Sequence, residues 1–202
     1  MEETKIQFSP LEIELLCNQE IILTKNKVIE KVKRLLENVQ NNFQSYIEQK
    51  PSLAQSEFFS MHPKISKGEN YLGLPYLILD YPRCFQQQDI FAIRTMFWWG
   101  NFYSTTLHLA GKFRAQFVNK IEDSFNFLSN ADYYIGINTD PWMHHFEEDN
   151  YQKLSTLTKE QFVQMCSNNQ HLKIAINTAI NSNGLQERLI NSWQELVKIC
   201  FV

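Results

Sequence analysis

The sequence predicts an α+β fold: an antiparallel sheet of four to five strands centred on a hairpin over residues 90–109 and packed against N- and C-terminal helices. Two segments rich in β-branched and aromatic residues, 90–99 and 102–109, flank Gly100-Asn101, a pair typical of a two-residue hairpin turn. Segments with a 3.6-residue apolar period lie on both sides of this hairpin. Because a hairpin joins the central strands, a parallel doubly wound sheet is disfavoured.

The N-terminal part of the chain is predicted to be helical. Ser9 and Glu12 have the spacing of a capping box, and Pro10 suits a first helical position, so a short helix is expected to reach about residue 18. A longer helix is predicted over 25–48, where apolar residues recur with a helical period. Residues 49–72 contain two prolines and scattered Ser and Lys, and we expect a long surface connection there.

The remaining elements alternate between helix and strand. Strands are predicted over 74–81 (ended by Pro82), 133–138 and 172–180 (with a helix as the alternative), and helices over 112–128, 157–166 and 185–200. A chain of 202 residues is long enough for one well-buried core. We therefore expect a single domain, 1–202, made of an N-terminal helical segment 9–48, the connection 49–72 and a sheet-containing segment 73–202.

The charge balance argues against a nucleic-acid partner. The chain has 19 basic and 22 acidic residues, a net charge of −3, whereas proteins that grip a phosphate backbone usually carry a basic surface. The best basic cluster, Lys27, Lys31 and Arg34, is one helical stripe next to Glu30 and Glu37. We interpret it as a solvated helix face.

Cysteine spacing and hydropathy indicate a reducing, aqueous compartment. Cys17, Cys84, Cys166 and Cys200 form no CxxC pair, so we expect buried reduced thiols. The N-terminus has no apolar segment typical of a signal peptide, and no apolar run approaches the ~20 residues that cross a bilayer. These observations predict a soluble, cytoplasmic protein with no membrane partner.

Known cofactor and metal motifs are missing from the sequence. No GxGxxG, GxxxxGK or GxSxG is present, so no nucleotide cofactor is expected. The segment 140–149 contains His144 and His145 among carboxylates but lacks the helical HExxH pattern of zinc hydrolases. We therefore interpret it as a turn with solvated charges, and expect no metal ion and no other cofactor.

The densest aromatic cluster, RTMFWWGNFY at 94–103, is the candidate binding surface. A two-residue turn pairs Trp99 with Phe102, Phe97 with Ser104, Thr95 with Thr106 and Ile93 with His108 on one face. Large rings opposite small hydroxyls and a histidine form a trough with polar groups, typical of small-molecule pockets. The alternative is an ordinary sheet core, and a shift by one residue would exchange the two faces.

Arg94 is the exceptional residue of this hairpin, because a guanidinium is rarely buried without a partner. It either pairs with a carboxylate of the protein or holds an anionic group of a ligand. Asp80 and Arg83 mark the end of the neighbouring strand, where they either line the same site or simply meet water. The candidate ligand-binding residues are therefore Arg94, Phe97, Trp99, Ser104, Thr106, His108 and Asp80.

Three functions are compatible with these residues. The first is a non-enzymatic small-molecule-binding or interaction domain, with an aromatic pocket and an anion-binding arginine, that takes a small anionic or aromatic ligand. The alternative is an enzyme of an unrecognised family, such as a metal-dependent hydrolase that uses His108 or His144 and His145 with nearby carboxylates; no residue is assigned a catalytic role. The third is a structural role through an exposed aromatic patch, which implies a homo-oligomer.

Overall fold

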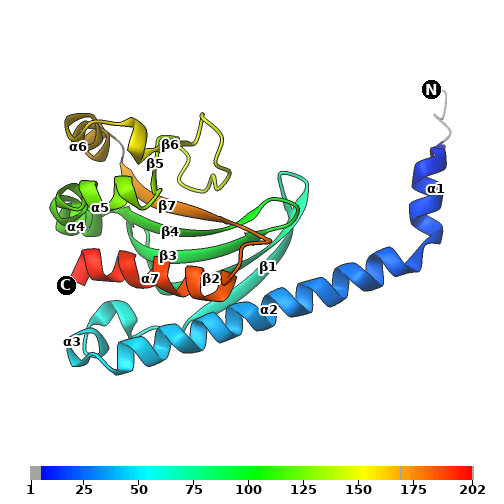
Figure 1. The fold of residues 1–202 in the computed structure, drawn as a ribbon, viewed down its shortest axis with the longest axis horizontal. Helices are drawn as coiled ribbons and strands as arrows, with labels where there is room; N and C mark the ends of the chain where they lie inside the picture. Colours follow the sequence, from blue (N-terminus) through cyan, green and yellow to red (C-terminus); the bar gives the residue numbers. More distant parts are fainter. Residues whose placement is uncertain (1–5, 169, 202) are drawn as a thin grey trace.

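The computed structural model describes residues 6–168 and 170–201, and it has one antiparallel sheet with helices packed on it (Figure 1). The predicted α+β fold is confirmed, with seven strands in place of the expected four to five. In chain order the elements are α1 (Pro10–Cys17), α2 (Gln19–Glu48), α3 (Pro51–Ala54), the 3₁₀ helix η1 (Glu57–Phe59), β1 (Lys64–Tyr71), β2 (Leu74–Gln86), β3 (Asp89–Trp98), β4 (Phe102–Ala110), α4 (Gly111–Asp123), α5 (Phe125–Asn130), β5 (Tyr134–Gly136), β6 (Tyr151–Lys153), the 3₁₀ helix η2 (Leu154–Thr156), α6 (Lys159–Asn168), β7 (His171–Ala179) and α7 (Leu185–Phe201).

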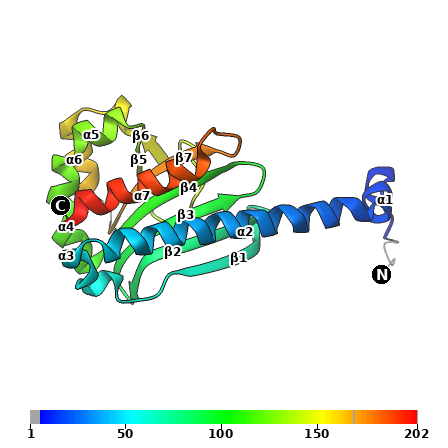
Figure 2. The ribbon, with the colours of Figure 1, turned by 60° about the horizontal axis from the view of Figure 1, so that its bottom comes forward.

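The strands lie in the order β1-β2-β3-β4-β7-β5-β6, and α2, α4 and α7 cover one face (Figure 2). The main core lies between this face and the helices. At its centre Trp193 of α7 stacks on Phe43 of α2, with ring centroids 4.2 Å apart, and lies parallel to the Tyr81 ring of β2. None of the helices within residues 6–168 and 170–201 is long and apolar enough to cross a bilayer.

The prediction of a long surface connection over 49–72 is wrong, because this segment contains α3, η1 and β1. Phe58 and Phe59 of η1 are buried in the main core and anchor the segment. β1 is an edge strand with a mostly polar sequence, KISKGENY, so it lacks the apolar alternation that identifies a half-buried strand.

Other element boundaries differ from prediction for local reasons. β2 continues past Pro82 to Gln86, because the ladder shifts register between Asp80 and Arg83 and proline is tolerated at such an irregularity. The helix expected over 112–128 divides into α4 and α5 at Ser124, and β6 was not expected. α2 begins six residues before residue 25, at Gln19.

The four cysteines divide into two groups. Cys84, Cys166 and Cys200 are buried free thiols, as expected, whereas Cys17 at the end of α1 is exposed. The apolar neighbours of Cys17 in the sequence predicted burial, but α1 has no buried residue. Its burial was therefore wrongly predicted.

The predicted register of the central hairpin is wrong by one residue. The structure pairs Trp98 with Phe102 and Met96 with Ser104, so the connection contains three residues, Trp99, Gly100 and Asn101. Gly100 has a φ of +75°, and a three-residue loop with one left-handed glycine is the next most common hairpin connection. The strands are as predicted, but their facing side chains change.

Candidate functional site

The observed register places a row of polar and charged side chains across the face of the sheet opposite the helices. Asp80 on β2 pairs with Arg94 on β3, and Arg94 pairs with Thr106 on β4. Two positions along β4, His108 lies beside Lys173 of β7. Because alternate residues of a strand share a face, four central strands bring these five side chains to one surface.

Asp80 and Arg94 form a two-bonded ion pair on this surface. Arg94 Nε donates to Asp80 Oδ1 at 2.8 Å, and Nη2 donates to Oδ2 at 2.9 Å. The remaining terminal nitrogen of Arg94, Nη1, lies 3.1 Å from Nε2 of His144, which must accept because a guanidinium only donates. Burial is the main cause that lowers the pKa of His144 well below its ordinary value, and Arg94 adds to it. His144 is therefore a neutral acceptor.

Lys173 is a second cation on the same surface, with 1% of its surface exposed. Its ammonium donates to the carbonyl of Met143 and lies 4.9 Å from the centroid of the Tyr151 ring. Burial lowers the pKa of Lys173 to about 7, and the nearby Arg94 charge acts in the same direction. Near neutral pH this side chain can therefore exchange a proton.

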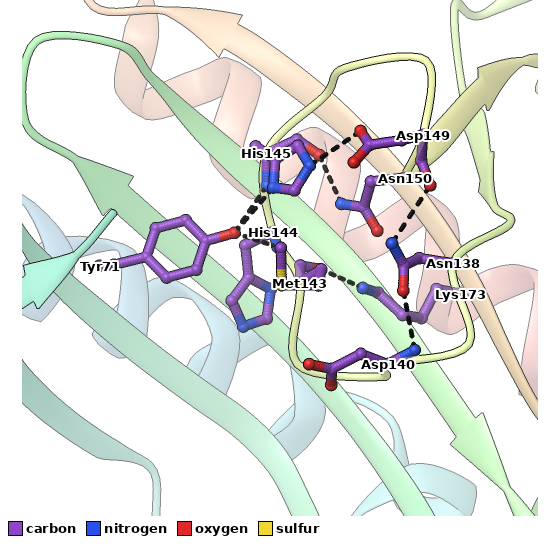
Figure 3. A network of polar contacts seen from close by, with 9 residues as sticks. All are labelled: Tyr71, Asn138, Asp140, Met143, His144, His145, Asp149, Asn150 and Lys173. Carbon is purple, nitrogen blue, oxygen red and sulfur yellow. Dashed lines mark hydrogen bonds and ion pairs between the residues drawn. The ribbon is translucent and has the colours of Figure 1, made fainter. Parts of the chain in front are cut away.

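The loop 137–150, between β5 and β6, covers these groups, and a polar network holds it to the sheet (Figure 3). Tyr71 Oη of β1 accepts from the backbone N–H groups of His144 (2.6 Å) and His145 (3.1 Å). Its own proton is then free to bond Nδ1 of His145 at 3.1 Å, which leaves His145 Nε2 to donate to Asp149 at 3.1 Å. The ring of Trp142, in this loop, lies over the Arg94 guanidinium, whose Cζ is 5.7 Å from the ring centroid.

A groove of about 830 Å³ opens beside this loop. His108, His171 and Arg114 lie along it, and its side near α4 is formed by Ala110 and Gly111. Within the described residues its lining contains no Asp or Glu, while Gln87, Gln88, Gln170 and Thr139 supply neutral polar groups. Arg114 is the permanent cation of this lining, while Asp140 acts on His171 from nearby and raises its pKa, against the larger effect of burial.

Two imidazoles of this groove have unused hydrogen-bonding atoms. His108 and His171 are 5% and 7% exposed, and Nε2 of each is buried with no hydrogen-bond partner among residues 6–168 and 170–201. Their ring centroids lie 5.8 Å apart. Buried polar atoms are nearly always paired, so two unpaired nitrogens on neighbouring rings are an exception that no described residue accounts for.

The electrostatic environment keeps both imidazoles neutral. Burial is the main cause that lowers the pKa of His108 to about 3, and Lys173, His171 and Arg94 add to it. Burial also lowers the pKa of His171, with a further contribution from Lys173. An anion in the groove would oppose the contribution of these neighbouring charges, while burial, the larger cause, would still favour the neutral imidazoles.

The structure brings four of the seven sequence-predicted site residues close together. Arg94, Thr106 and His108 line a small buried cavity of about 10 Å³ with Lys173 and His144, and Asp80 is bonded to Arg94. Ser104 is buried on the same face, opposite Met96. Phe97 lies on the other face, in the main core, because of the register shift, and Trp99 lies in the turn and packs against that core. The predicted aromatic trough is therefore wrong.

Sequence reasoning missed Lys173, His171, Arg114 and Tyr71. One signal was present in β7, where His171, Lys173 and Asn177 alternate with Leu172, Ile174 and Ile176. This alternation resembles that of Ser104, Thr106 and His108 in β4, and together they indicate one polar face. The contribution of Tyr71 has no local signal, because its partners lie more than 70 residues away.

Comparisons with known proteins find no family model that matches the chain, no curated protein of similar sequence and no solved structure of similar fold. In the part of the chain that the structure describes, no three His, Cys, Asp or Glu side chains are grouped so that they could hold a metal ion.

Proposed function

We propose that this protein binds a small anionic ligand, bearing a carboxylate or phosphate group, in the groove between the loop 137–150 and the start of α4. The observation that carries the proposal is the pair of buried, unpartnered Nε2 atoms of His108 and His171. The aromatic groups near the groove are Trp142, whose ring lies 5.5 Å from that of His108, and Phe85.

The charges around the groove support an anion over a neutral or cationic ligand. Arg114 contributes a guanidinium at the edge, and Lys173 lies behind His108 in the small cavity. Asp80 neutralises Arg94 and occupies its Nε and Nη2, so Arg94 supports the site through its bond to His144 and is not free to bind the ligand. The positive end of α4 adds to the attraction, although Asp89 already accepts from its Lys112 N–H.

Thermal denaturation with inorganic phosphate and with succinate as probes tests this proposal. A ligand at about 100 times its Kd adds ~2.7 kcal/mol to stability. In a chain of this size each kcal/mol raises Tm by roughly 2–4 °C, so a rise of about 5–10 °C is expected.

The matched variants are His108→Leu and His171→Leu. Since neither Nε2 has a protein partner, we expect these variants to fold but to lose the ligand-induced rise in Tm. His62→Leu, at an exposed position outside the groove, is the control and should keep it. No rise for the native chain with either probe, or an undiminished rise in both groove variants, would contradict the proposal.

A second candidate function is carbonyl chemistry at Lys173. A buried amine near a second cation is neutral at lower pH than an exposed one, which is what a Schiff-base nucleophile needs. Its Nζ would attack the carbonyl carbon of an oxoacid and release water, after the loop 137–150 opens. Incubation with glyoxylate and cyanoborohydride should then place a stable adduct on Lys173 faster than on the exposed Lys198. Equal or slower labelling of Lys173 would exclude this candidate.

A further inference from the structure

An N-terminal arm (residues 6–24) projects away from the sheet and its helices (Figures 1 and 2). It contains α1 and the beginning of α2, and α1 has no buried residue. Nine of the fifteen exposed large apolar side chains among the described residues lie on it: Ile6, Phe8, Leu11, Ile13, Leu15, Leu16, Ile21, Ile22 and Leu23, with exposures of 42–89%. A segment that is apolar on all sides is typical of a buried helix.

The arm has little within its own chain to stabilise it. α1 has eight residues, and helices shorter than ~12–15 residues are marginal in water. The Ser9–Glu12 capping box closes its first turn, but no core side chain packs on it. Burial of its apolar side chains against a partner would supply the packing that α1 lacks.

The arm and the helix that follows it have opposite charges. Residues 6–24 contain Glu12, Glu14 and Glu20 and no lysine or arginine. The next part of α2 exposes Lys27, Lys31 and Arg34, and none of these three forms an ion pair within residues 6–168 and 170–201. Two copies placed antiparallel would bring the acidic arm of each beside the basic stripe of the other.

We propose that the N-terminal arm is a self-association surface, on which a second copy of this chain packs antiparallel, with acidic arm against basic stripe and apolar side chains between. The interface is isologous, so both copies contribute the same residues and each contact occurs twice. A membrane is a poor occupant, because helices that lie on bilayers carry Lys or Arg on their polar face and anionic lipids repel carboxylates.

The available area is sufficient for a stable dimer. A fully buried large apolar side chain removes on the order of 100 Å² from water, and the nine side chains of the arm are about half exposed. Two copies then bury roughly 900 Å² of apolar surface. With the apolar share of ~65% found in homodimer interfaces, the total is about 1,400 Å², within the standard range.

Sedimentation equilibrium of the full chain tests the surface. Interfaces of this size have Kd values of about 1 μM or tighter, so a dimer is expected at ~10 μM. Leu16→Ser/Ile22→Ser should raise the Kd on the order of 100-fold, since truncation of central apolar contacts is the most costly. Phe127→Ser, at an exposed site on α5, is the control and should leave it unchanged.

A charge-exchange experiment distinguishes the antiparallel pairing from non-specific hydrophobic association. Glu14→Lys/Glu20→Lys and Lys27→Glu/Lys31→Glu should each be monomeric, and an equimolar mixture should form a heterodimer, because each arm then meets a stripe of opposite charge. Sedimentation equilibrium of the mixture, with each variant alone as its control, follows this exchange. A native chain that stays monomeric, binding to phosphatidylserine vesicles as a monomer, unchanged association of the Leu16/Ile22 variant, or no heterodimer would each overturn the proposal.

Discussion

Replacement of Asp80 by asparagine is expected to destabilise the protein strongly, because it leaves Arg94 as an uncompensated charge on the face of the sheet that the loop 137–150 covers. The two side chains are only 11% and 16% exposed, and both carboxylate oxygens bond the guanidinium. Loss of one partner of such a pair costs about 3–5 kcal/mol. The lost charge is also the only carboxylate in contact with Arg94 among the described residues.

Urea denaturation measures this effect directly. With a slope of ~2 kcal/mol per M, a loss of about 4 kcal/mol moves the midpoint down by ~2 M. Arg94→Met should have a comparable effect, since it leaves Asp80 without its cationic partner and removes the donor to His144.

The double variant provides the control. Asp80→Asn/Arg94→Met leaves neither charge behind, so it should cost about 2 kcal/mol, well below the sum of the single changes. A single Asp80→Asn cost under ~1 kcal/mol, or a double variant equal to the sum, would refute the assigned pairing.

Three further predictions concern the face of the sheet under the loop 137–150. With the pKa of Lys173 near 7, the folded protein binds fewer protons than the unfolded chain up to pH 10.5, so the free energy of unfolding should rise by roughly 1.5 kcal/mol from pH 7 to 8.5. Lys173→Met should remove this pH dependence in urea titrations. The pKa of His108 is lowered to about 3 in the folded state, so between pH 6 and 4 only the unfolded chain binds a proton there, and the free energy of unfolding should fall by about 2 kcal/mol. His108→Leu should abolish this loss when the two chains are compared at each pH. Tyr71→Phe leaves two backbone N–H groups without their acceptor, so it should cost ~2–3 kcal/mol and speed hydrogen exchange at the amides of His144 and His145; unchanged exchange there would contradict the anchoring role of Tyr71.

Local sequence signals identified most elements of the fold correctly. The capping box at Ser9–Glu12 is formed as predicted, and the apolar period of α2 and α7 places Phe43 and Trp193 in the core. These signals are local, because a cap and a helical stripe depend on residues three to seven positions apart. β1 lacks such a signal, since an edge strand buries little.

The candidate site was only partly predictable. Arg94, Thr106 and His108 were identified because polar residues in apolar strands are conspicuous. Phe97 and Trp99 were assigned to the site through a two-residue turn, and the three-residue connection moved Phe97 to the core. Side chains alternate with a period of two, so one extra residue in a turn exchanges both faces of the hairpin.

By itself the sequence determined that this chain forms an antiparallel sheet with helices, and that Arg94 needs a charged partner. Only the tertiary structure decided that this partner is Asp80, that Lys173 and His171 arrive from β7, and that Tyr71 holds the loop over them. The physical reason is distance along the chain. Periodicity and capping act over a few residues, whereas the ion pair, the buried amine and the groove depend on strands that meet only after the sheet has formed.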